Sequence, residues 1–242
     1  MSLVPSRSGA LAVILASLAA LAWTALELVQ PASGFDDTDS PTVTLQFLAL
    51  HRDVWAIAGI VLLLLGIAMV VATFAVADLL AVRSGSLTVR SVSAAGLFAA
   101  GSFFMFGVLR SGAGPVLYLE SLREEWGQAA FLVIQVVGIH GFAQAALLGF
   151  CLWATAISVV ALRSGALPRS LCVLGVIPAT RIAVLVLGAT GSSASLPDGL
   201  WVLAMITIPG TFAWSLILGL VLLRRSLLGL EGDARAEFIR AT

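Results

Sequence analysis

The chain has 242 residues, of which 60% are hydrophobic and 11% charged, and its mean hydropathy is +1.08. These values lie well outside the range of water-soluble domains and indicate an integral membrane protein. The 13 basic residues, all of them arginine, balance 13 acidic residues. The charge pattern therefore gives no polybasic surface for nucleic acid and no acidic disordered tail.

Long apolar runs predict the architecture. A bilayer core of about 30 Å needs about 20 apolar helical residues. Six such runs predict an all-α, polytopic transmembrane helix bundle that forms a single domain, 1–242. The expected spans are 9–29, 54–82, 91–109, 138–162, 171–189 and 200–223. The expected outer loops are 30–53, 110–137 and 190–199, and 224–242 is the expected cytoplasmic tail.

Two of the runs have alternative interpretations. Arg7 and the small residues at 20–22 give the first run the look of a secretory signal, but its apolar stretch exceeds the roughly 7 to 15 residues of a signal core. We therefore expect a retained helix. The fourth run covers 35 residues, 128–162. Either its outer end projects from the membrane, or an interfacial stretch at 127–139 leads into a span that begins near His140; a seventh span is the third alternative.

The arginines predict the orientation, because short loops rich in basic residues stay cytoplasmic. With the N-terminus inside, nine of the 13 arginines are cytoplasmic, whereas Arg52, Arg110 and Arg123 face out and Arg181 lies within a span. This bias predicts a multi-pass protein of the cell membrane, of the bacterial inner-membrane type, with both termini cytoplasmic. Aromatic residues that favour the headgroup region fall near the expected outer interface, namely Trp55, Tyr118, Trp126 and Trp201.

One short pattern occurs twice. RSGSLTVRS at 83–91 resembles RSGALPRS at 163–170, about 80 residues later, and each joins an inward-running span to an outward-running one. The pair is either a tandem hairpin repeat, as in some transporters, or two short cytoplasmic turns built from the same residue types.

Ionisable groups inside a span are expensive and are the first place to look for function. Arg181 lies 12 residues after Arg169, roughly 18 Å along a helix, which places it in the outer half of the bundle. Glu27 is at a comparable depth in the first span. It is expected either to pair with Arg181 or to extend to the interface.

Further polar residues lie near the same level. His51 precedes the second span, and His140 shares a helix face with Gln144 in the fourth run. Two histidines at one depth leave haem ligation open as an alternative to ordinary solvated histidines, and neither cysteine belongs to a CxxC pair that would indicate another metal. The residues expected to line an outward-facing pocket for a small or lipidic ligand are Glu27, His51, Asp53, His140, Gln144 and Arg181.

Small residues and prolines predict how the helices pack. Gly141, Ala145 and Gly149 recur every four residues, a spacing that lets membrane helices approach closely. Pro178 and Pro209 lie inside the fifth and sixth spans and are expected to kink them. Such kinks either mark a transporter binding site or are packing features.

The sequence contains none of the common soluble-enzyme motifs: no GxSxG, no HExxH, no P-loop and no glycine-rich dinucleotide fingerprint. The expected function is therefore non-enzymatic, namely binding of a small or lipidic ligand, or of a membrane protein partner, through the outer half of the bundle. The alternatives are a small secondary transporter and a haem-binding redox membrane protein.

Two segments carry a family resemblance. GFCLWATAISVVALRSGALPRSLCVLGVI (149–177) and HRDVWAIAGIVLLLLGIAMVVATFAVADLL (51–80) resemble the bacterial six-helix membrane proteins of domain of unknown function 4386. The similarity covers about half the chain and lies in hydropathy and turn residues. The third span departs from the family, because it has only SAAGLFAAGSFF where an arginine or other polar residue is expected. The resemblance implies six helices and no established activity.

Overall fold

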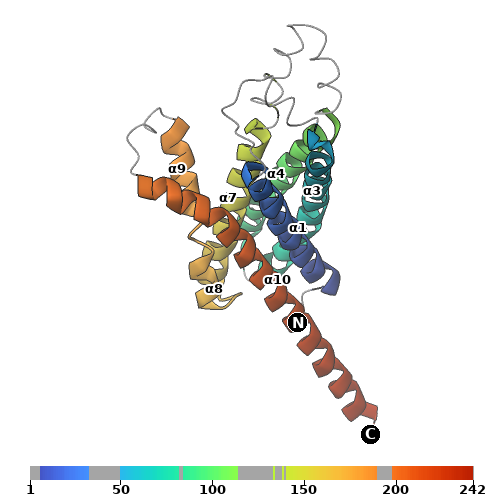
Figure 1. Cartoon of the computed structure of the whole chain (residues 1–242). Helices are drawn as coiled ribbons and strands as arrows, with labels where there is room; N and C mark the ends of the chain where they lie inside the picture. Colours follow the sequence, from blue (N-terminus) through green and yellow to red (C-terminus); the bar gives the residue numbers. More distant parts are fainter. Residues whose placement is uncertain are drawn as a thin grey trace.

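The computed structural model describes residues 6–32, 50–81, 84–113, 133, 138, 140–189 and 198–241, and every element among them is helical (Figure 1). The helices are α1 (Arg7–Ala32), α3 (Arg52–Ala81), α4 (Ser86–Val108), the π-helical turn η1 (Leu109–Ala113), α7 (Gly141–Ser164), α8 (Arg169–Leu174), α9 (Ala179–Ala189) and α10 (Asp198–Ala241).

Five of these helices are long and apolar enough to cross a membrane. A helix satisfies its own backbone hydrogen bonds, which is what an environment without water demands. The predicted helical membrane bundle is thus confirmed, while the fifth predicted span, 171–189, is divided between α8 and α9 and stays a prediction. The five candidate spans are Arg7–Glu27, Asp53–Ala81, Ser86–Gly112, Gly141–Ser164 and Ile206–Leu228.

The helices form a closed ring around an aromatic interior. In order around the ring, α1 packs on α3, α3 on α4 and α4 on α7; α8 and α9 then lie between α7 and α10, and α10 returns to α1. Ring centroids in the interior are 5.1 to 6.3 Å apart, mostly edge to face, an arrangement that aromatic pairs prefer. The interior rings belong to Trp23, Phe103, Phe106, Phe150, Trp153 and Phe212.

Glycines set the closest helix contacts. A Cβ atom added to Gly66 of α3 would lie 2.9 Å from the Ala100 carbonyl oxygen of α4. Within the predicted small-residue triplet, an added Cβ at Gly149 would lie 3.0 Å from the Cα of Ala99, whereas Ala145 is half-buried and Gly141 exposed. The close approach of α7 to α4 is therefore centred on Gly149.

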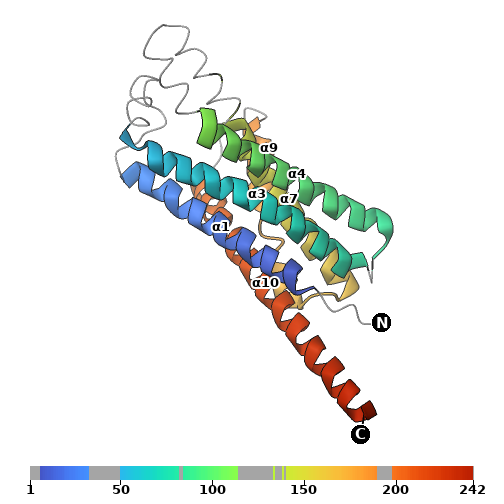
Figure 2. The same cartoon turned by 90° about the vertical axis from the view of Figure 1, so that its right-hand side faces the viewer.

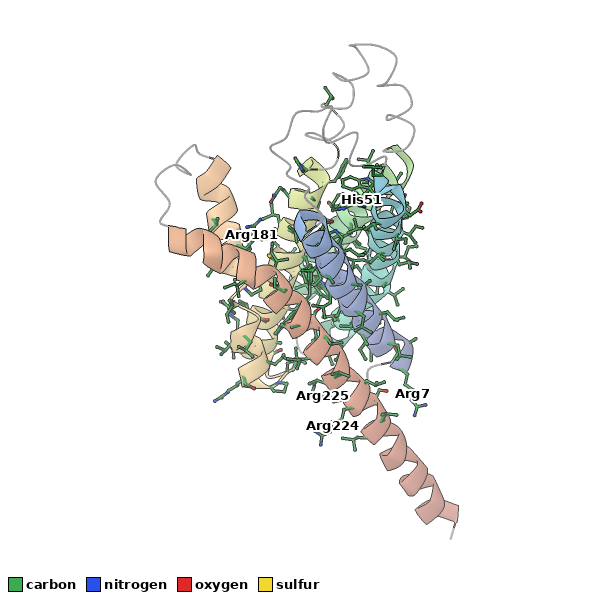
Figure 3. The ribbon with its side chains drawn as sticks, in the orientation of Figure 1. Arg7, His51, Arg181, Arg224 and Arg225 are labelled. Atoms are coloured by element: carbon green, nitrogen blue, oxygen red, sulfur yellow. The ribbon has the colours of Figure 1, made fainter. Side chains whose placement is uncertain are left out.

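The two ends of the bundle differ. Arg7, Arg224 and Arg225 lie at one end and His51 at the other (Figure 3); we refer to them as the Arg7 end and the His51 end. Helix α10 runs unbroken through Pro209 and projects from the bundle at the Arg7 end, so the two chain termini lie on the same side (Figures 1 and 2). That this side is cytoplasmic stays a prediction.

A break, rather than the predicted kink, occurs at Pro178. Proline has no N–H to donate to the carbonyl of Leu174 four residues earlier. Instead the Ile177 N–H donates to that carbonyl at 3.2 Å, and further bonds of the same three-residue spacing continue as far as the Arg181 N–H. These tighter turns occupy 175–178 and separate α8 from α9.

The break is packed between α7 and α10. The indole N–H of Trp214 on α10 donates to the Leu171 carbonyl at 2.8 Å. A Cβ atom on Gly175 would collide with Oγ of Ser158 on α7 and would lie 2.6 Å from the Trp214 ring. Only glycine fits this position without displacing its neighbours.

The two similar arginine turns have different conformations. Gly85, before α4, is extended with φ of −66°, whereas Gly165, after α7, is left-handed with φ of 64°. The first turn leads into an unbroken span and the second into the short α8, with its Ala166 carbonyl bound by Arg225 at 2.6 Å. These differences favour two independent short turns over a tandem repeat.

Replacement of Gly175 tests the packed break. We expect Gly175→Ala to lower the free energy of unfolding by about 1–3 kcal/mol, because the added methyl group overpacks the space beside Trp214. Thermal unfolding in detergent micelles measures the effect. Gly101→Ala on α4 is the matched control, since its Cβ meets nothing within 4 Å. Equal melting temperatures for the two variants would contradict the packing described.

Candidate functional site

A partly buried ion pair joins three helices at the His51 end. The Arg110 side chain, 2% exposed, forms an ion pair with Glu27 of α1, whose side chain is 33% exposed. The Trp23 indole N–H donates to the same carboxylate oxygen at 2.7 Å. The Arg110 guanidinium also lies over the Trp55 ring of α3, 4.0 Å from its centroid, as in a cation–π contact. Helices α1, α3 and α4 therefore meet at one charged centre.

The π-helical turn η1 brings Arg110 to this centre. It continues α4 past residue 110, where the outer loop 110–137 was expected to begin, so Arg110 belongs to a candidate span. Its close approach to α3 depends on Gly59, since a Cβ there would lie 2.6 Å from the Ser111 backbone nitrogen. π-Helical turns are frequent at functional sites.

The second buried arginine has a different environment. Arg181, the third residue of α9, is 4% exposed. Its Nη2 donates to Oε1 of Gln144 on α7 at 3.5 Å, the long limit of a hydrogen bond. Its Nε and Nη1 have no hydrogen-bond partner in the described part of the chain. Figure 3 shows Arg181 in the half of the bundle that also contains His51.

The expected polar pocket is therefore divided. Glu27 pairs with Arg110 and not with Arg181, and Gln144 contacts Arg181. The sequence interpretation missed Arg110 because the third apolar run ends at Leu109, and a lone arginine after such a run resembles a loop residue. The signal that could have indicated it is charge balance, because a carboxylate inside a span at Glu27 requires a cation at equal depth.

The histidines flank helix starts. His51 is half-buried just before α3, and its carbonyl accepts the Trp55 N–H at 3.1 Å. His140 is exposed at the residue before α7, and Asp53 is exposed in the first turn of α3. Among the residues that the structure describes, no three His, Cys, Asp or Glu side chains gather as a group that could hold a metal ion.

The two arginines differ in how far the surrounding residues compensate their charge. Arg110 already has a carboxylate and an aromatic face, so its charge is largely compensated within the chain. Arg181 offers several N–H donors and a full positive charge, with one neutral amide as its hydrogen-bond acceptor. Arg181 and Gln144 are therefore the candidate functional site.

No protein-family model matches the chain, and neither a curated protein nor a solved structure matches it.

Removing the carboxylate of Glu27 tests the charged centre. We expect Glu27→Ala to lower the free energy of unfolding by about 3 kcal/mol, because it leaves the Arg110 charge buried without a partner. Glu27→Gln, which keeps a hydrogen-bond acceptor, should lose less. Denaturant titration in micelles measures both.

The matched control is Asp78→Ala, which removes an exposed carboxylate from α3. In a double-mutant cycle, Glu27→Ala and Arg110→Met should show strong non-additivity. Additive losses would mean that the ion pair contributes nothing to the bundle.

Proposed function

We propose that this chain is a non-enzymatic, multi-pass membrane protein that binds a small or lipidic ligand at the His51 end of the bundle, beside Arg181. The observation that carries the proposal is that Arg181 is buried yet has a single, weak hydrogen-bond partner among the described residues. A buried guanidinium in an apolar bundle is costly and marks a functional site by default. A ligand would supply the missing acceptors.

The proposed orientation places the Arg7 end in the cytoplasm and the ligand site in the outer half of a bacterial cell membrane. Exposed arginines support it, because those described on α1, on α10 and on the helix ends around the two short turns follow the positive-inside pattern. These exposed arginines are Arg7, Arg90, Arg163, Arg169, Arg224 and Arg225.

We also propose that the chain is related to the proteins of domain of unknown function 4386, which two of its segments resemble.

A small secondary transporter is the second candidate function. The observation that favours it is the break at 175–178, since discontinuous helices form substrate sites in many transporters. Arg181 follows that break by only three residues. A transporter predicts that Arg181→Leu abolishes substrate uptake while the protein still inserts into the membrane.

Native mass spectrometry of the protein, released from mild detergent, tests ligand binding directly. We expect one non-covalent adduct per chain on the wild-type protein and its loss in Arg181→Met, because the adduct depends on the guanidinium. An absorbance spectrum of the same sample reveals haem, the alternative cofactor, by its Soret band.

Arg169→Met is the matched control, because it removes an exposed arginine at the start of α8, on the other side of the break from Arg181. The adduct should persist in this variant. A wild-type chain that carries no adduct, or an adduct that Arg181→Met retains in full, would contradict a ligand site at Arg181.

A further inference from the structure

The unused donors of Arg181 define what the site can recognise. A guanidinium carries five N–H donors: one on Nε and two on each Nη. Gln144 accepts from Nη2, and that single bond occupies at most one of the five. Whichever Nη2 hydrogen it takes, one two-pronged edge of the guanidinium stays complete, either Nε with Nη2 or Nη1 with Nη2. Such an edge matches the two oxygens of a carboxylate or phosphate.

The charge of Arg181 lacks a counter-charge in the described part of the chain. Gln144 is neutral, and no carboxylate among the described side chains forms an ion pair with Arg181. The same bundle shows what a compensated arginine requires, since Arg110 has both a carboxylate and an aromatic face. Arg181 has neither within the described residues.

The position of Gln144 gives the site access. Arg181 is buried, but the Gln144 residue that it contacts is exposed on α7. The contact between them therefore lies at the edge of the bundle, where α7 meets α9. The exposed Gln144 therefore marks the side from which a ligand would reach the guanidinium.

We propose that Arg181 and Gln144 bind an oxyanion, a carboxylate or phosphate group, in two-pronged contact with the guanidinium. This inference rests on the proposed function and names its ligand class. The oxyanion belongs either to the headgroup of an anionic lipid or to a free solute, because both present the same oxygens to the arginine.

A melting-temperature titration of the delipidated protein in uncharged detergent tests the proposal. The probes are inorganic phosphate, a short-chain phosphatidylglycerol, and a short-chain diacylglycerol as the control lipid without a phosphate group. A ligand that binds only the folded chain raises the melting temperature in a saturable way. We expect such a rise with an anionic probe, and an affinity at least tenfold weaker in Arg181→Met.

The variants separate charge from geometry. Arg181→Lys keeps the charge but loses the planar fork, so it should bind more weakly than wild type and more tightly than Arg181→Met. It also serves as the test if Arg181→Met fails to fold. Arg169→Met, at the exposed surface of α8, should bind as wild type does. A response to phosphatidylglycerol alone identifies a lipid headgroup, whereas a response to phosphate as well identifies a free anion.

Two results would overturn the proposal: no saturable rise with either anionic probe, or equal affinity in wild type and Arg181→Met. Its failure is distinguishable from that of the proposed function. Mass spectrometry could instead find an adduct whose mass identifies a molecule without a carboxylate or phosphate group, and Arg181→Met could lose it. That result would leave a ligand site at Arg181 but exclude an oxyanion. The absence of any adduct together with no anion response would remove both.

Discussion

The cost of a charge inside an apolar bundle constrains this structure more than any other factor. In a medium with few water molecules, each buried guanidinium needs acceptors for its N–H groups and a counter-charge nearby. Among the described side chains two such groups are buried, those of Arg110 and Arg181. How each group is compensated determines which part of the bundle is structural and which part can bind a ligand.

The helix ring follows from this division. On one side, Arg110 holds α1, α3 and α4 together through Glu27 and Trp55, and glycines let α3 and α4 approach closely around it. On the other side, α8 and α9 replace a continuous span, and the break between them is fixed by Trp214. Arg181 follows that break, where the bundle provides one amide. Both arginines keep nitrogens without a hydrogen-bond partner among the described residues, but the first is paired with a carboxylate and the second only with a neutral amide.

The sequence was sufficient to predict the helical membrane architecture, because apolar runs of about 20 residues leave few alternatives. It also placed Arg181 and Gln144 among the candidate residues. It could not assign their partners. Pairing between helices depends on their order around the ring, which hydropathy does not encode, so the carboxylate of Glu27 could not be matched with Arg110 in place of Arg181.

The break at Pro178 shows a second limit. Proline predicts a missing hydrogen bond, but whether a helix kinks or breaks depends on its neighbours. At Pro209 the helix continues, whereas at Pro178 the adjoining Gly175 lets Ser158 and Trp214 enter the gap. Whether the helix breaks therefore depends on how α8 and α9 pack against α7 and α10. The spacing of apolar residues within one segment does not reveal that packing.

A density map of the protein in lipid nanodiscs would show directly whether Arg181 holds a ligand. We expect non-protein density within hydrogen-bond distance of the Arg181 guanidinium, at the edge where α7 meets α9. An acidic side chain of the chain itself bound to Arg181, with no other density beside it, would contradict a ligand site there, because the arginine would then be compensated in the same manner as Arg110.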